Sequence, residues 1–264
     1  MSKNSKDEKL QSFGKLLDIM DKLRTDCPWD REQTFDSLRN LTIEETYELA
    51  DAIINSEMSQ IRNELGDLLL HIVFYSRMAS EKDEFDIRDV CEAISEKLIF
   101  RHPHVFGNTD VKNNSGIVKR NWEELKIKEG NPSVLGGVPT SLPAVIKASR
   151  IQEKAAAVGF DWEIKEQVWD KIREELDELK IEIDAMDPQK TEAEFGDLLF
   201  SVINAARLYD IDPETALERT NRKFISRFNY LESRTLKRGR ALKNMSLDEM
   251  NEIWEESKKN GGKS

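Results

Sequence analysis

Acidic residues recur in two matching patterns, one in each half of the chain. Each is a Glu-Glu-x-x-Glu motif followed by Glu-x-x-Asp: Glu44, Glu45, Glu48, Glu64 and Asp67 in the first half, and Glu174, Glu175, Glu178, Glu194 and Asp197 in the second. Carboxylates gathered in one place repel one another unless a cation neutralises them. Oxygen ligands without His or Cys favour a hard divalent cation, and Mg²⁺ takes part of its coordination shell from substrate phosphates.

The repetition argues against acids that are only solvated. With 51 Asp and Glu among 264 residues, one such five-carboxylate pattern is expected by chance on the order of 0.1 times per chain. The second copy keeps the spacing, because the two motifs start 20 residues apart in both halves, from 44 to 64 and from 174 to 194. A basic pair and a Trp-Glu-Glu follow each copy: Lys97, Arg101 and Trp122, then Lys223, Arg227 and Trp254.

Two predicted helices of the second half, 165–185 and 188–209, each display polar side chains along one face. Those faces consist of Lys171, Glu174, Glu175 and Glu178 on the first helix, and of Lys190, Glu194, Asp197, Ser201 and Asn204 on the second. The short connection between them favours an antiparallel hairpin, in which the acidic faces converge.

Helical patterns fill most of the chain, and no convincing strand is present. A composition that is 34% charged and 38% hydrophobic, with 12 Gly and 7 Pro, favours an all-α fold. Further helices are predicted at 42–54, 60–79, 87–100, 117–128, 144–158, 213–237 and 246–259. Helix-breaking residues concentrate between Gly130 and Pro139. The sequence therefore predicts an N-terminal module (1–130), a linker (131–143) and a C-terminal module (144–264).

The charge and the cysteines limit the partners and the location. A net charge of −11 argues against a nucleic acid or an anionic membrane surface as the main partner. Cys27 and Cys91 have no Cys or His neighbours at zinc-binding spacing, which fits a reducing cytoplasm. The most apolar run, 65–75, contains Asp67 and His71, so no membrane-crossing segment is predicted.

Three further segments, with the acidic motifs, make nearly the whole chain similar to the MazG family of nucleoside triphosphate pyrophosphohydrolases. They are Cys27-Pro-Trp-Asp-Arg-Glu-Gln-Thr-Phe35, Arg101-His-Pro-His-Val-Phe106 and Val158-Gly-Phe-Asp-Trp162. The resemblance implies two tandem MazG-like helical modules that form four-helix-bundle-type assemblies in a homodimer. It also implies cleavage of NTPs and dNTPs to the monophosphate and pyrophosphate, which clears nucleotide pools. Mg²⁺ is the implied metal, with Mn²⁺ as a substitute.

The same resemblance assigns roles in the second half. The implied metal ligands are Glu175, Glu178, Glu194 and Asp197, and the implied catalytic glutamates are Glu174, Glu175 and Glu178. The implied substrate contacts are Lys171, Lys190, Lys223 and Arg227, with Trp254 at the nucleoside. Asn204, on the same helix face as Glu194 and Asp197, is a further candidate substrate contact. A metal-bound water deprotonated by a glutamate is the expected nucleophile. The sequence does not identify which glutamate acts as the base.

The two halves differ at the expected substrate contacts. Aligning the acids puts Leu41, Gln60 and Phe74 opposite Lys171, Lys190 and Asn204. We therefore expect the main activity in the second half. The first half keeps a metal-capable group, Glu44, Glu45, Glu48, Glu64 and Asp67, with a weaker, different or regulatory role.

Three alternatives compete with this interpretation. A di-iron carboxylate bundle needs Glu-x-x-His pairs, which are absent from the sequence, and Ser201 stands where the first half has His71. A non-enzymatic interaction or regulatory protein would use its acidic faces for solubility alone. A substrate range restricted to a deoxy or damaged nucleotide stays open, because the residues that contact a base are not distinct in the sequence.

Overall fold

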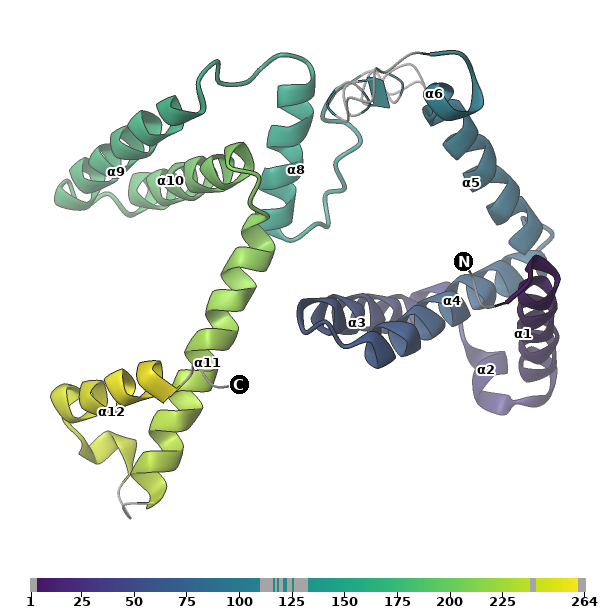
Figure 1. Ribbon diagram of the computed structural model, residues 1–264, viewed down its shortest axis with the longest axis horizontal. Helices are drawn as coiled ribbons and strands as arrows, with labels where there is room; N and C mark the ends of the chain where they lie inside the picture. Colours follow the sequence, from purple (N-terminus) through teal and green to yellow (C-terminus); the bar gives the residue numbers. More distant parts are fainter. Residues whose placement is uncertain are drawn as a thin grey trace. The chain divides into compact units, whose positions relative to one another are not determined.

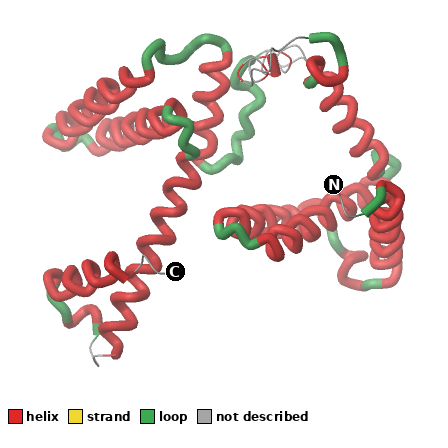
Figure 2. Tube along the Cα trace, in the orientation of Figure 1, coloured by secondary structure: helices red, strands yellow, loops and turns green. Residues whose placement is uncertain are grey.

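The computed structural model describes residues 4–109, 116, 118, 121, 122, 125, 133–237 and 241–260. Within these residues every regular element is a helix, which confirms the predicted all-α fold (Figures 1 and 2). None of the described helices has an apolar stretch of the length that crossing a bilayer requires. The helix expected at 117–128 falls largely outside the described residues.

The chain forms two compact units, Met1–Lys112 and Asn113–Ser264. The more detailed division into modules at 1–130 and 144–264 stays a prediction. In the first unit the helices are α1 (Lys6–Asp26), α2 (Pro28–Glu32), α3 (Phe35–Ile54), α4 (Met58–Ser80), α5 (Ile87–Arg101) and α6 (Pro103–Phe106). In this unit α3 and α4 pack as a hairpin and α1 packs against α4. Their buried side chains form one core of Met20, Leu38, Val73, Phe74 and Met78.

Two helix starts in the first unit differ from the sequence prediction. The helix expected from residue 42 begins earlier, at Phe35, because Thr34 caps it: the Ser37 N–H donates to Thr34 Oγ1 at 3.1 Å. The Cys27-Pro28 segment, where no helix is predicted, contains the short helix α2, with Pro28 at its first position. Proline suits that position, because its missing N–H has no intrahelical partner there.

In the second unit the helices are α8 (Ala144–Ala157), α9 (Val168–Asp184), α10 (Pro188–Leu208), α11 (Pro213–Lys237) and α12 (Leu247–Asn260), with short 3₁₀ turns at Lys165–Gln167 and Leu242–Asn244. The helices α9 and α10 pack against each other along their length, and α12 packs on α11 (Figure 1). The predicted second-half hairpin is therefore present.

The same backbone turn closes both hairpins. Ser56 ends the α3 side with φ 59° and Met186 ends the α9 side with φ 55°, and each follows its helix at the matching position of the repeat. The next N–H reaches back in each case, from Glu57 to the Ala52 carbonyl at 3.0 Å and from Asp187 to the Glu182 carbonyl at 3.4 Å. A left-handed residue with this bond ends many helices. The internal repeat thus extends to the backbone.

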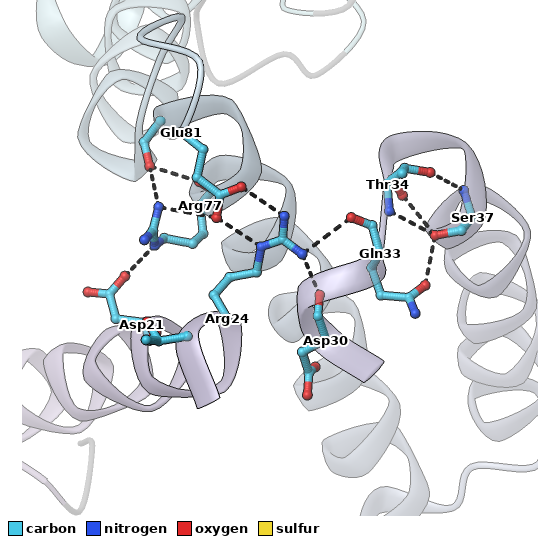
Figure 3. Close-up of polar contacts among 10 residues, drawn as sticks. Asp21, Arg24, Asp30, Gln33, Thr34, Ser37, Arg77 and Glu81 are labelled. Carbon is cyan, nitrogen blue, oxygen red and sulfur yellow. Dashed lines mark hydrogen bonds and ion pairs between the residues drawn. The ribbon is translucent and has the colours of Figure 1, made fainter. Parts of the chain in front are cut away.

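In the first unit Arg24 joins three segments (Figure 3). Its guanidinium donates to Glu81 just after α4, at 2.9 Å from Nε and 2.8 Å from Nη2. It also donates to the backbone carbonyls of Asp30 and Gln33, which flank the end of α2. The Arg24 side chain is only 10% exposed, so the protein rather than water satisfies its guanidinium.

We expect Arg24→Ala to lower the free energy of unfolding by about 2 kcal/mol, because partly buried acceptors lose a charged donor while Glu81 keeps some solvent. The hydrogen bond from Arg24 holds the pKa of Glu81 below its ordinary value. This stabilisation is present above the unfolded pKa of about 4.3 and is lost as the pH falls below it.

Chemical denaturation of the full chain at pH 7 and pH 3 measures this loss. Arg88→Ala is the matched control, because Arg88 pairs with Glu92 at an exposed site. It should lower the free energy of unfolding much less than Arg24→Ala does, because solvent screens an exposed pair. Equal effects of the two variants at pH 7 would contradict the role given to Arg24.

Candidate functional site

The α9–α10 hairpin brings three predicted acids together. Carboxylate oxygens of Glu175, Glu194 and Asp197 all lie within 4.8 Å of one another. Glu175 is buried at 5% exposure, Glu194 is half-buried and Asp197 is exposed. The group therefore opens to solvent on one side, as a site for a soluble ligand must.

The electrostatics of Glu194 suit a cation. Burial raises its pKa, and the neighbouring charges of Glu178, Asp197, Glu175 and Glu182 raise it further. One of its carboxylate oxygens, Oε2, is buried and has no hydrogen-bond partner in the structure. An unpartnered buried oxygen beside two other carboxylates fits a bound divalent cation, because the cation supplies the missing partner and offsets the repulsion. These acidic residues can therefore hold a metal ion.

Glu178 lies outside the three-carboxylate group. It contributes negative charge at Glu194, but it is not one of the residues whose ligand oxygens converge within 4.8 Å.

Lys171 bridges two glutamates at the edge of the group. Its Nζ lies 2.8 Å from Glu174 Oε1 and 2.7 Å from Glu175 Oε1. The bonds to Glu174 and Glu175 raise the pKa of Lys171, so the ammonium stays charged. Lys190, at the start of α10, lies 3.7 Å from Glu182 and is largely exposed. The hairpin therefore offers both oxygens that could hold a metal ion and lysine ammonium groups near them.

The remaining predicted substrate contacts form a second group on α11 and α12. The Trp254 ring lies 5.1 Å from that of Phe224, and the Arg227 guanidinium lies 6.0 Å above Trp254. Lys223, one helical turn before Arg227, is exposed. Among the described residues, no hydrogen bond or ion pair joins this group to Glu175, Glu194 or Asp197. The two groups therefore lie on different helix pairs, α9–α10 and α11–α12.

The first half repeats the acidic group. Carboxylate oxygens of Glu45, Glu64 and Asp67 also lie within 4.8 Å of one another. Burial, followed by the charges of neighbouring acids, raises the pKa of Glu45 and of Glu64. Glu44 and Glu48 contribute charge to Glu45 but not an oxygen to the group. The acidic grouping is therefore shared by both halves, while the lysines and the amide beside it belong to the second.

An arginine that the sequence analysis did not single out supports each hairpin. Arg207 donates to both carboxylate oxygens of Asp161, at 3.0 and 2.5 Å, and its Nε donates to Asn204 Oδ1 at 3.0 Å. Arg77 stands at the matching position of the first half and pairs with Asp21 at 2.6 Å. The internal repeat could have identified these arginines from the sequence. Both follow the motif aspartate by ten residues, from 67 to 77 and from 197 to 207.

Comparison with known proteins places these features in a family. Fold and site define a tandem all-α protein in which each helical hairpin carries a metal-capable carboxylate group. The model of the MazG nucleotide pyrophosphohydrolase domain matches the chain twice, at residues 33–106 and 165–231. The chain belongs to the MazG family.

Two relatives match almost end to end. The nucleoside triphosphate pyrophosphohydrolase of Escherichia coli (strain K12) is 42% identical over 259 residues, which cover 95% of this chain and 98% of the relative. The nucleoside triphosphate pyrophosphohydrolase/pyrophosphatase MazG of Thermotoga maritima is 44% identical over 251 residues, covering 93% and 95%. The family resemblance seen in the sequence is confirmed.

Proposed function

We propose that this chain is a Mg²⁺-dependent nucleoside triphosphate pyrophosphohydrolase that releases a nucleoside monophosphate and pyrophosphate. The observation that carries the proposal is the convergence of Glu175, Glu194 and Asp197, with one buried oxygen left without a partner. The names of the two nearly full-length relatives support the same reaction. An all-oxygen ligand set favours Mg²⁺ over softer ions, with Mn²⁺ as a substitute.

In this proposal the acids hold the metal and the lysines hold the phosphates. Glu175, Glu194 and Asp197 supply ligand oxygens, and Glu178 adds charge and completes the set of four. When bound, the metal neutralises phosphate oxygens and lowers the pKa of water, which is the chemistry that pyrophosphate cleavage needs. Glu174, Glu175 and Glu178 are the candidates for accepting the proton of the attacking water.

The cations of the hairpin have a matching role. Lys171 is bound to Glu174 and Glu175, and a triphosphate would compete with these carboxylates for its ammonium. Lys190 is exposed on the same side of α10 as Glu194. Positioned cations of this kind stabilise charge that develops on phosphate oxygens during cleavage. The first half has Leu41 and Gln60 at these places, which supports the second half as the main active site.

We also propose a cytoplasmic homodimer. The outer side of α10 exposes Phe195, Leu199 and Val202, at 49%, 61% and 47%. A two-helix hairpin with such a face is completed when a second copy covers it and makes a four-helix assembly. Lys223, Arg227 and Trp254 would then reach a triphosphate within the assembly. A monomeric mass in light scattering at working concentration would contradict this part of the proposal.

The product pattern tests the proposed reaction. Incubation with each NTP and dNTP should yield monophosphate and pyrophosphate in equal amounts, with little diphosphate. Chelating the divalent cation should lower the rate roughly 10²-fold or more, since the metal supplies several kcal/mol of charge stabilisation. Chromatography of the nucleotides together with a pyrophosphate assay measures both. Diphosphate and inorganic phosphate as the main products would contradict the proposed bond.

A non-enzymatic scaffold makes the opposite prediction. Isothermal titration with Mg²⁺ and a non-hydrolysable NTP should show metal-dependent nucleotide binding if the hairpin is an active site. Absence of binding, together with absence of turnover, would favour the scaffold. Competition among the NTPs and dNTPs, scored by monophosphate product, then defines the preferred base.

A further inference from the structure

Arg207 occupies an unusual place beside the candidate site. Two of its N–H groups donate to the carboxylate of Asp161, in the loop after α8. Its Nε–H donates to the Asn204 side-chain oxygen at 3.0 Å. The Arg207 side chain is 16% exposed, so water replaces these bonds poorly. Burial raises the pKa of Asp161, but the bonds from Arg207 and from the Trp162 N–H outweigh it and leave the pKa lowered. Asp161 therefore stays charged and holds the arginine in place.

The contact from Arg207 fixes which way the Asn204 amide points. Arginine carries donors only, so the atom of Asn204 that faces it must be the carbonyl oxygen. The Asn204 NH₂ group then points elsewhere. Among the described residues it has no hydrogen-bond partner, and it is not among the buried polar atoms that lack one. It is an oriented pair of donors open to solvent.

This donor lies on the face of α10 that carries the acids. Asn204 follows Glu194, Asp197 and Ser201 along that face. Seven residues beyond Asp197, it stands about 10 Å further along the helix axis. The proposed phosphate contact Lys190 lies at the opposite end of this face, before Glu194. A triphosphate that extends from Lys190 past the acids would bring its nucleoside end to Asn204. The NH₂ group therefore suits an acceptor on the sugar or base rather than a metal-bound phosphate oxygen.

The matching arginine of the first half, Arg77, shows which contacts of Arg207 are common to both hairpins. Arg77 occupies the same position and also pairs with a carboxylate from the preceding segment, Asp21. Its neighbour at the place of Asn204 is Phe74, which is buried in the core. The carboxylate pairing is thus common to both hairpins, but the amide contact exists only in the second. A polar amide in place of a core phenylalanine gives up apolar burial, which is consistent with a functional reason for it.

We propose that Arg207 is a positioning residue, which holds the Asn204 amide as a donor toward the nucleoside portion of the substrate. This inference rests on the proposed function. Arg207→Lys keeps the positive charge and one bond to Asp161. A lysine cannot donate two hydrogen bonds to the Asp161 carboxylate and a third to the Asn204 side chain in the geometry of a guanidinium. Asn204→Ala removes the donor and leaves the Arg207–Asp161 pair.

The experiment is a double-mutant cycle on the full chain. KM and kcat are measured for wild type, Asn204→Ala, Arg207→Lys and the double variant. We expect Asn204→Ala to raise KM about tenfold, the effect of one hydrogen bond, with kcat within about twofold, because the acids are two helical turns away. Arg207→Lys should raise KM several-fold by itself and add nothing in the Asn204→Ala background.

Two controls decide the outcome. Arg77→Lys should leave KM unchanged, and melting temperatures report any loss of folding. Additive effects of Arg207→Lys and Asn204→Ala on KM, or a fall in kcat at unchanged KM, would overturn the positioning role. If wild type releases no pyrophosphate, the proposed reaction is wrong. The Kd for a non-hydrolysable NTP with Mg²⁺ is then measured for the same four proteins in place of KM. Wild type that neither hydrolyses nor binds would overturn both.

Discussion

Glu175→Ala is expected to lower kcat/KM for pyrophosphate release roughly 10³-fold, while Glu45→Ala keeps most of the wild-type activity. Glu175 is the buried member of the second-half group and the partner of Lys171 at 2.7 Å. Its removal takes away a proposed ligand oxygen and leaves Lys171 paired with Glu174 alone. Glu45 has the matching position in the first group, but Leu41 replaces the lysine there.

A third variant keeps this comparison independent of folding. Glu175→Gln preserves the side-chain volume at a buried position, so it should fold even if Glu175→Ala does not. Its kcat/KM should fall as far as that expected for Glu175→Ala. The measurement is pyrophosphate release at saturating Mg²⁺, with circular dichroism to confirm the helices. Loss of turnover in Glu45→Ala with activity retained in Glu175→Ala would assign the main activity to the first half instead.

The helical hairpins could be predicted because their signals are local. Apolar and acidic positions alternate with the period of a helix along 165–185 and 188–209, and the short turn around Met186 leaves the chain little choice but to fold back. Convergence of the acidic faces of the two helices follows from those two facts. The start of α3 was missed for a local reason as well, because the cap at Thr34 lies before the apolar pattern begins.

The supporting ion pairs could not be predicted because they join distant residues. Arg207 and Asp161 are 46 positions apart, and Arg24 and Glu81 are 57 apart. No helical period links such partners, and many charged residues of the chain could have paired with them. The repeat was the one usable signal, since Arg77 and Arg207 match in position. Which of the carboxylate oxygens converge is also decided by side-chain rotamers, which periodicity does not contain.

The acidic group carries a conflict between stability and function. Burial and neighbouring carboxylates raise the pKa of Glu194. A carboxyl whose pKa is higher in the folded than in the unfolded state binds its proton more tightly when folded. Protonation of Glu194 therefore stabilises the folded state at low pH. This stabilisation is lost as the pH rises from the unfolded-state pKa of about 4.3 through the higher folded-state pKa. At neutral pH the ionised group opposes folding until a cation is bound.

Glu194→Gln should therefore raise the melting temperature of the metal-free protein at pH 7 and, in the same molecule, lower pyrophosphate release roughly 10²- to 10³-fold. The amide keeps the shape of Glu194 but removes its charge and one ligand oxygen. Mg²⁺ should then raise the melting temperature of wild type more than that of the variant, because ligand binding stabilises only the form that binds it. Differential scanning calorimetry in chelator and in Mg²⁺ measures both shifts.

Glu64→Gln is the matched control for this prediction, because burial and the charges of Glu48 and Asp67 also raise the pKa of Glu64. It should raise the metal-free melting temperature in the same direction while pyrophosphate release stays near the wild-type rate. A Glu194→Gln protein that melts lower than wild type in chelator would show that the carboxylates do not repel one another in the folded chain. The need for a cation at the hairpin would then lose its physical basis, whatever the effect on turnover.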